Sequence, residues 1–156
     1  MTLTPSEIPQ LLRTAKTVAI VGISDKPDRP SYGVARYLQE NSHFELFFVN
    51  PVIEEVLGQK VYISLKEIPV HIDIVDVFRR PADCLPVLEE AIEIDADAIW
   101  LQLGIAVPEV AEQGASAGIE VVMDRCIKVE HARYVGRMHW LGFNTQRITS
   151  VRGGLQ

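Results

Sequence analysis

The sequence predicts an α/β fold, in which β-strands alternate along the chain with helices. Short apolar runs rich in β-branched residues recur through the chain, and they are apolar at consecutive positions. This pattern is typical of strands that are buried on both faces of a parallel sheet. Segments with helix-start and helix-end signals lie between the runs. The order predicts a Rossmann-like doubly wound sheet in a single three-layer domain over residues 1–156.

Each apolar run is predicted to form one strand of this sheet. The predicted strands are Val18–Val21, Phe44–Val49, a short one near Val61–Tyr62, Ile72–Phe78, Ala98–Gln102 and Glu120–Met123. The regular core is expected over about residues 15–133. We expect the tail over 135–156 to be less regular, and Gly153-Gly154 favours fraying near its end.

Helices are predicted between the strands from the signals at their ends. The predicted ranges are Pro5–Thr14, Ser31–Gln39, Asp83–Ile94 and Pro108–Ala117. Thr4 is the expected N-cap of the first helix, and Glu7 completes a capping-box pattern three residues later. The last helix begins with a proline and is followed by Gly118, an asymmetry that is common at helix ends.

The helix predicted over Asp83–Ile94 is amphipathic. Leu85, Leu88 and Ile92 would share the face that packs on the sheet. Pro86 would lie in the first turn, where a proline is tolerated.

Composition and charge narrow the class of protein. The formal net charge of −6 argues against a nucleic-acid-binding protein, but it does not exclude an anionic ligand. Cys84 and Cys126 form no disulfide framework, which fits a reducing compartment. Residues 1–10 show no signal-peptide pattern, and no apolar run is long enough to span a bilayer. We therefore expect a cytoplasmic protein without a nucleic-acid or membrane partner, either a monomer or a small homo-oligomer.

The most informative stretch follows the first predicted strand. The strand runs into Gly22, and the loop that follows carries Lys26 and Arg29 before Pro30-Ser31 begins an amphipathic helix. Backbone N–H groups and the positive end of the helix dipole favour a phosphate at such a helix start. The stretch therefore predicts a phosphate-containing ligand.

Other polar residues follow the remaining predicted strands. Ligands of open α/β sheets bind outside the carboxyl ends of the strands, so these loops would meet at one edge. The candidate residues are Gly22, Ile23, Ser24, Asp25, Lys26, Arg29, Pro30, Ser31 and Tyr32, then Asn50 and Pro51, then Phe78, Arg79 and Arg80, and then Gln102, Leu103 and Gly104. The arginines and Lys26 would form a site for a polyanion beside the helix start.

Each candidate also has a purely structural interpretation. Gly22 could serve a tight turn, Ser31 could be a plain N-cap, and Asn50-Pro51 could be a turn. Arg79-Arg80 could lie in a solvated loop. Their joint placement at several strand ends favours the functional interpretation over the structural one.

Motifs that the chain lacks argue against some classes of nucleotide ligand. The dinucleotide fingerprint G-x-G-x-x-G is absent, since the first loop holds only Gly22 and, much later, Gly33. Asn50 stands where NAD enzymes have an acidic residue for the ribose hydroxyls. The chain also has no P-loop motif, which excludes a P-loop NTPase.

At this point the sequence resembles a known family, the small stand-alone CoA-binding proteins. It is similar as well to the CoA-binding domain of the succinyl-CoA synthetase alpha subunit. The segments that carry the resemblance are VGISDKPDRPSYGVARYL, FVNP, EVLGQKVYISLKEIP, DIVDVFRRP, WLQLGI and VVMDRCIKVEH. They extend over roughly residues 15–133.

The resemblance implies a Rossmann-like domain that binds coenzyme A or an acyl-CoA through its ADP portion. It implies that Gly22 to Asp25 lie beside the pyrophosphate, and that Arg29, Ser31 and the helix start near Tyr32 bind the phosphates. It also implies that Asn50-Pro51 and Phe78 lie beside the nucleotide, with Arg79 and Arg80 nearby. Gln102, Leu103 and Gly104 would contact the pantetheine arm. The synthetase also needs a second domain and a beta subunit, for which this chain leaves no room. We therefore expect a non-catalytic sensor, carrier or regulatory module rather than a ligase.

Two other hypotheses remain open at this level. One is a small NAD(P)-dependent or thiol-disulfide oxidoreductase that uses Cys126, with His131 nearby in the sequence. The other is a subunit that awaits a separately encoded ligase partner. Cys126 could equally lie in a structural turn, or it could form a mixed disulfide with the CoA thiol. Cys84, at a helix start, is expected to serve packing.

The histidines, the isolated carboxylates and the tryptophans complete the prediction. His43, His71 and His139 show no metal-ligand spacing with one another, so no metal site is predicted from the sequence. Asp76 is unusual because it falls inside a predicted strand. Trp100 and Trp140 fit either a core or an interface, and a core position is the more common one.

Overall fold

A central sheet organises the computed structural model, which describes residues 2–4 and 6–136. The sheet has seven strands in the order β3-β4-β2-β1-β5-β6-β7. Their bounds are Thr17–Val21 (β1), Glu45–Val49 (β2), Glu55–Val56 (β3), Gln59–Tyr62 (β4), Ile74–Val77 (β5), Ala98–Leu101 (β6) and Glu120–Val122 (β7). All neighbouring strands pair in parallel except β3, which pairs antiparallel with β4 at the sheet edge.

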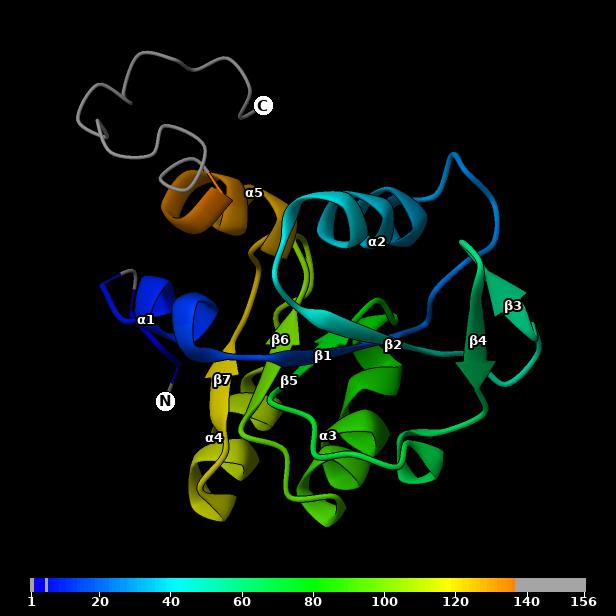
Figure 1. The fold of residues 1–156 in the computed structure, drawn as a ribbon. Helices are drawn as coiled ribbons and strands as arrows, with labels where there is room; N and C mark the ends of the chain where they lie inside the picture. The colour runs from blue at the N-terminus through cyan, green and yellow to red at the C-terminus, as the bar shows by residue number, and fades with distance from the viewer. Residues whose placement is uncertain (1, 5, 137–156) are drawn as a thin grey trace, which may run out of the picture.

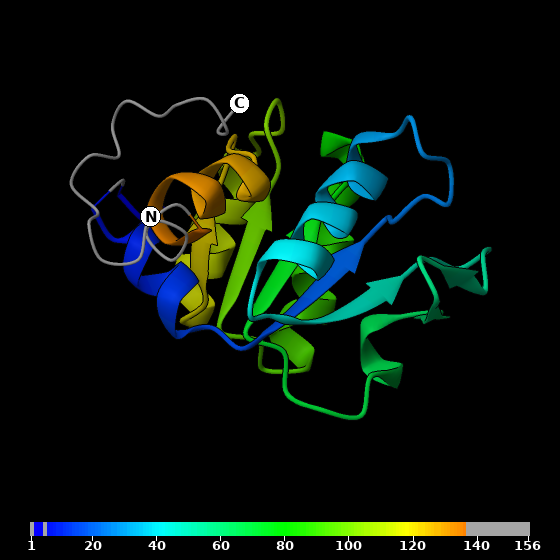
Figure 2. The ribbon, with the colours of Figure 1, turned by 45° about the horizontal axis from the view of Figure 1, so that its top comes forward.

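The strand order confirms the predicted Rossmann-like fold. Without β3, the order reads 3-2-1-4-5-6 along the chain, which is the Rossmann arrangement. After β1 the chain proceeds to one side of the sheet, and after β4 it returns to the other side at β5. The topological switch point therefore lies between β1 and β5. Figure 2 shows these strands side by side and the loop after β1 leading into α2.

Helices cover both faces of the sheet, as Figure 1 shows. Their bounds are Ile8–Thr14 (α1), Pro30–Asn41 (α2), Cys84–Glu93 (α3), Pro108–Ala117 (α4) and Ile127–His131 (α5). One core cluster joins the sheet to α1, α2 and α5, and a second joins it to α3 and α4. Short helical turns lie at Leu65–Glu67, Pro81–Asp83 and Ala132–Gly136. None of the helices in the described residues is long and apolar enough to cross a lipid bilayer.

The central strands are buried along their whole length. Every residue of β5 and β6 is buried, and so are the last four of β1 and β2. This confirms the interpretation of the uninterrupted apolar runs, because helices cover both faces of such strands. β2, β5, β6 and β7 are shorter than predicted by one to three residues, whereas β1 begins one residue earlier than predicted and β4 begins two residues earlier.

The first helix differs from its prediction. It begins at Ile8 instead of Pro5, and Thr4 is not its N-cap. A turn precedes the helix instead, in which the Glu7 carboxylate accepts a hydrogen bond from the Thr4 N–H at 2.7 Å and one from the Thr4 hydroxyl at 3.0 Å. Only the glutamate half of the capping box is therefore formed.

The third helix buries only part of the predicted stripe. Its buried residues are Cys84, Val87, Leu88 and Ala91, whereas Ile92 is 37% exposed. Leu88 is buried as predicted, and Leu85 packs partly buried against the same core. The prediction for Pro86 is confirmed, since this residue lies in the first turn of α3.

The last two helices illustrate what end signals can and cannot predict. α4 has the predicted bounds, and Gly118 ends it with φ +80°, in the left-handed region that favours glycine. α5 was not predicted, because five residues are too few for a recognisable periodicity. Of the predicted irregular tail, residues 137–156 lie outside the described residues.

Candidate functional site

Four predicted site residues lie next to one another at the carboxyl edge of the sheet. Gly22, Asn50, Phe78 and Gln102 each follow the last residue of a strand directly. The strands end in register, with Val21 opposite both Val49 and Val77, and Val77 opposite Leu101. The switch point between β1 and β5 therefore lies between Gly22 and Phe78.

The backbone approaches itself closely at Gly22. This residue has φ +90°, and a Cβ built onto it would lie 2.3 Å from the Phe78 carbonyl oxygen and 3.4 Å from Arg79 Nε. The Phe78 N–H donates to the Val21 carbonyl at 2.8 Å. Gly22 is therefore required by a close approach between two loops as well as by its own backbone conformation.

Side chains hold the loop after β1 in place. Asn50 Nδ2 donates to the Ile23 carbonyl at 2.9 Å, while Asn50 Oδ1 accepts from the N–H of Val52 at 2.7 Å. The Ser31 hydroxyl oxygen accepts the N–H of Ser24 at 3.0 Å. Asn50 thus acts as the predicted turn residue and also joins the loops after β1 and β2.

Ser31 has a different structural role from the one proposed for it. It lies inside α2, whereas Arg29 is the N-cap residue and makes no side-chain capping bond. The Ser31 side chain is buried, and its hydroxyl accepts a loop N–H instead of capping the helix. The interpretation as a plain N-cap is therefore wrong.

The lysine and arginine side chains of the site differ in their exposure and in whether they form an ion pair. Lys26 and Arg29 are exposed and have no acidic partner among the described residues. Arg80 makes an exposed ion pair with Asp83, Nε to Oδ2 at 3.2 Å, and Arg79 is half-buried against Gly22. Asp25, Pro30 and Pro51 are exposed, Ile23 is buried, and Tyr32 is half-buried. Two cations are therefore free to contact an anion beside the start of α2.

The loop after β6 binds the segment that leads into α5. The Ile127 N–H donates to Gln102 Oε1 at 3.2 Å, and the Gly104 N–H donates to Asp124 Oδ1 at 2.7 Å. Gln102 is buried, whereas Leu103 is 69% exposed. The polar groups of this loop are thus engaged within the protein, and Leu103 offers an apolar side chain to solvent at the same edge.

The two cysteines occupy different environments. Cys126 is half-buried and is the N-cap residue of α5. Cys84 is buried, and desolvation together with the Asp83 charge raises the pKa of its thiol. Cys84 therefore packs in the core, as predicted. His131 is also buried, and its Nδ1 lies 3.0 Å from the Tyr37 hydroxyl.

Trp100 and Asp76 are neighbouring core residues on β6 and β5, below the candidate site. Trp100 is fully buried and donates from Nε1 to the Arg125 carbonyl at 2.8 Å, so it is a core residue; Trp140 lies outside the described residues. Asp76 is opposite Trp100 in the sheet, two residues before Phe78 on β5. Neither Asp76 carboxyl oxygen has a hydrogen-bond partner in the described part of the chain. Burial raises the pKa of Asp76 well above its ordinary value.

The contribution of α5 and of the loop before it was not predicted. The Asp124 carboxylate accepts the Gly104 N–H, and the φ of Asp124 itself is +59°. An aspartate directly after a predicted strand tolerates this conformation well, which was the available signal. No local pattern indicated that Gln102 would accept from Ile127, since 25 residues separate them.

The chain is similar in sequence and in structure to other proteins of about the same length. It is 45% identical over 127 residues to the uncharacterized protein YneT of Bacillus subtilis, covering 81% of this chain and 93% of the relative. A solved structure of a hypothetical protein from Pyrococcus horikoshii superposes with a TM-score of 0.81 at 37% identity, covering 86% of this chain and 94% of the other.

A longer enzyme subunit matches over a shorter stretch. The acetate–CoA ligase (ADP-forming) II subunit alpha of Pyrococcus furiosus is 39% identical over 57 residues, which are 36% of this chain and 12% of that subunit. The model of the CoA binding domain family matches residues 16–132, most of the chain. This chain belongs to the family of CoA binding domains.

Proposed function

We propose that this protein binds coenzyme A or an acyl-CoA at the carboxyl edge of its sheet, through the ADP and pyrophosphate portion. The family supports CoA as the class of ligand. The observation that carries the proposal further is the pair of exposed cations, Lys26 and Arg29, which have no acidic partner among the described residues. They lie at the start of α2, whose backbone N–H groups and dipole favour a phosphate.

The close approach of Gly22 to Phe78 supports the same location. Because Gly22 has no side chain, the loops after β1 and β5 come close together at the switch point, where ligands of such sheets bind. Arg79 is beside Gly22 and would add a charge-assisted contact to a phosphate. The exposed side chain of Leu103 would contact the less polar pantetheine arm.

A nicotinamide dinucleotide fits these residues less well. The side chain of Asn50, which follows β2, is engaged with Ile23 and Val52 and carries no charge for the ribose hydroxyls. The oxidoreductase hypothesis also gains no support from the relatives. We therefore propose a non-catalytic sensor, carrier or regulatory module in the cytoplasm.

Calorimetric titration with CoA, acetyl-CoA, NAD, NADP and ADP tests this proposal, using one ligand at a time. CoA is expected to bind more tightly than NAD or NADP. At about 100 times the dissociation constant, the ligand should also stabilise the fold by about 2.7 kcal/mol, which a thermal melt detects. Binding of NAD or NADP in preference to CoA would overturn the proposal.

Matched arginine variants test the location of the site. Arg29→Ala and Arg79→Ala should each weaken CoA binding about 10- to 100-fold, the equivalent of one charge-assisted hydrogen bond. Arg36→Ala is the control, because Arg36 is also on α2 but is exposed and paired with Glu40 at 3.2 Å. Equal CoA affinity in all three variants would remove this edge from the proposal.

A further inference from the structure

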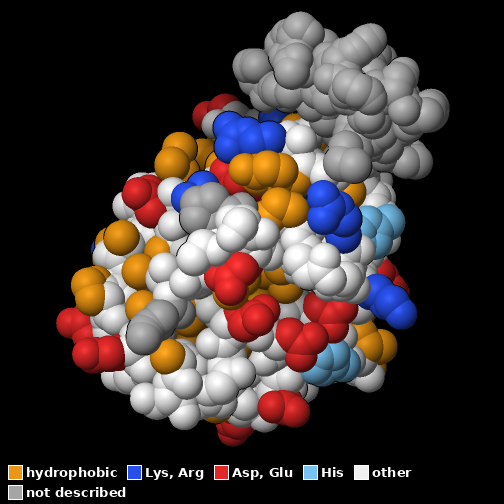
Figure 3. Space-filling model, turned by 90° about the vertical axis from the view of Figure 1, so that its left-hand side faces the viewer, with side chains coloured by type: hydrophobic (Ala, Val, Ile, Leu, Met, Phe, Trp, Pro, Cys, Tyr) orange, Lys and Arg blue, Asp and Glu red, His pale blue; other side chains and the backbone are white. Residues whose placement is uncertain are grey.

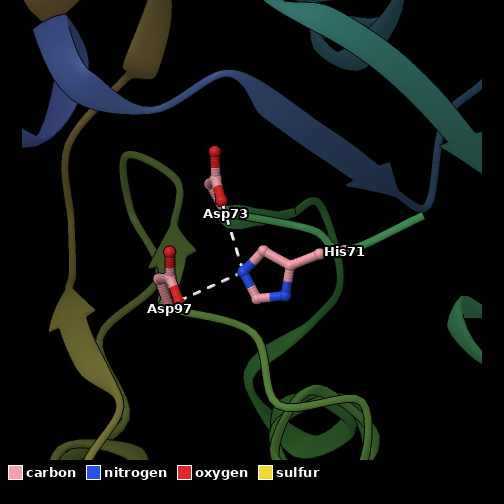
Figure 4. Close-up of side chains that lie close together, drawn as sticks. All are labelled: His71, Asp73 and Asp97. Carbon is pink, nitrogen blue, oxygen red and sulfur yellow. Dashed lines mark hydrogen bonds and ion pairs between the residues drawn. The ribbon is translucent and has the colours of Figure 1, made fainter.

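A separate cluster of titratable side chains lies at the opposite edge of the sheet. Asp73 and Asp97 directly precede β5 and β6, and His71 lies two residues before Asp73. Figure 4 shows both carboxylates directed toward one nitrogen of the imidazole. Figure 3 shows the face on the left-hand side of Figure 1, where several acidic side chains gather, some of them beside a histidine.

The distances in this cluster are short enough for one metal ion to contact all three side chains. His71 Nε2 is 3.3 Å from Asp73 Oδ1 and 3.2 Å from Asp97 Oδ1. One possible ligand atom from each of the three residues lies within 4.8 Å of those of the other two. Ligand atoms bound to zinc at about 2.0–2.1 Å lie about 3.3 Å apart in a tetrahedron. The distances of 3.2 and 3.3 Å are therefore compatible with two edges of such a tetrahedron.

The charges of the cluster favour a divalent cation. Two carboxylates share one imidazole nitrogen, which can carry at most one hydrogen for both of them. Neither Asp73 nor Asp97 pairs with a lysine or arginine side chain among residues 2–4 and 6–136. A divalent ion would neutralise both carboxylates and contact all three ligand atoms at once.

The backbone holds one ligand firmly in place. Asp73 Oδ2 accepts hydrogen bonds from the N–H groups of Lys16 at 2.6 Å and Thr17 at 3.3 Å, which leaves Oδ1 directed at His71. The Asp73 N–H also donates to the Thr17 hydroxyl at 2.8 Å. Hydrogen bonds of this kind orient the carboxylate ligands of metal sites.

We propose that His71, Asp73 and Asp97 bind a divalent metal ion of the zinc class through Nε2 and the two Oδ1 atoms. A nitrogen ligand with two carboxylates suits zinc and its neighbours better than magnesium or calcium, which prefer oxygen ligands alone. The side chains of His71 and Asp97 are 51% and 58% exposed, so water completes the coordination. Histidine spacing could not predict this site, because it contains one histidine.

Calorimetric titration of the full chain with zinc chloride alone tests the proposal. The protein carries no affinity tag and is first treated with a chelator, which is then removed. One ion per chain is expected to bind. Asp97→Asn should weaken that binding at least tenfold, while Asp95→Asn should change it less than twofold. Asp95 is the matched control because it is exposed, is two residues away, and has φ +62°, which asparagine tolerates.

Two further variants distinguish the proposed ligands from the half-buried thiol of Cys126. His71→Gln should lose affinity as Asp97→Asn does, and it keeps the test decisive if Asp97→Asn does not fold. Cys126→Ser should retain the tight site, because the thiol is not a ligand. Absence of zinc binding by the unaltered protein, or equal affinity in the unaltered protein and in both ligand variants, would overturn the proposal.

Discussion

At the scale of single residues, Gly22 shows how one position can be constrained twice. Its positive φ alone favours glycine, and Gly58 in the turn between β3 and β4 shares that property with φ +75°. At Gly58 a Cβ would meet no atom of the described residues within 4 Å, whereas at Gly22 it would meet the Phe78 carbonyl oxygen. A comparison of substitutions at the two glycines therefore distinguishes the cost of backbone strain, which both share, from the cost of the steric contact, which arises at Gly22.

Alanine substitutions should reveal this difference. Gly58→Ala is expected to lower the free energy of unfolding by about 1–2 kcal/mol, from the left-handed conformation alone. Gly22→Ala should cost at least about 1 kcal/mol more, because the β1 and β5 loops must also move apart. Urea denaturation of both variants measures the two costs. Equal costs would contradict the close approach at Gly22.

The two cysteines form another matched pair at the residue scale. If CoA binds beside the loop after β6, its thiol should reach Cys126. Cys126 is the N-cap residue of α5 and directly precedes Ile127, whose N–H donates to Gln102. With CoA disulfide, exchange would join Cys126 to one CoA and release the other CoA as a thiol. Cys84 is buried and its pKa is raised, so it should not react.

Mass spectrometry under non-reducing conditions tests this exchange. One added CoA is expected on the unaltered protein and on Cys84→Ser. No addition is expected on Cys126→Ser. If the unaltered protein gains no CoA mass, the mixed-disulfide hypothesis is wrong, although reversible CoA binding would remain as measured by calorimetry.

At the scale of elements, β5 carries a carboxyl group into the centre of the sheet. Asp76 lies between Ile20 and Trp100, is fully buried and has a raised pKa because of desolvation. Between the ordinary pKa of an aspartate and the raised pKa of Asp76 in the folded protein, the unfolded chain loses this proton while the folded protein keeps it. Stability should therefore fall as the pH rises above 3.8, the ordinary value, at about 1.4 kcal/mol per pH unit until the folded pKa is reached.

Asp76→Asn should remove this pH dependence. The variant is expected to be more stable than the unaltered protein at pH 7, and the difference should shrink toward pH 4. Chemical denaturation across this range measures it, with Asp95→Asn as an exposed control whose effect should vary less with pH. A stability difference that stays constant between pH 4 and pH 7 would contradict a buried neutral Asp76.

Helices also show which elements a local pattern can place. The bounds of α4 followed from its proline start and Gly118, because both end signals are local. The buried face of α3 was predicted only in part, since Leu88 is buried whereas Ile92 is exposed. β3 escaped prediction because two residues carry no detectable alternation.

At the scale of the whole molecule, the parallel sheet separates two candidate sites. Loops that follow the strands bring Gly22, Asn50, Phe78 and Gln102 to the carboxyl edge. Residues that precede the strands bring Asp73 and Asp97 together at the amino edge. Strands β5 and β6 therefore contribute to both candidate sites, through the residues that precede them at the amino edge and the residues that follow them at the carboxyl edge.

The sequence by itself determined the fold class, the alternation of strands and helices, the family resemblance and the edge at which the polar loops meet. These properties follow from local periodicity, end signals and the common direction of parallel strands. Only the tertiary structure decided that Gly22 abuts Phe78, that Asp76 is buried without a hydrogen-bond partner among the described residues, and that His71 contacts Asp97. Such contacts join residues far apart in the chain, so they depend on strand order and register, which no local pattern encodes.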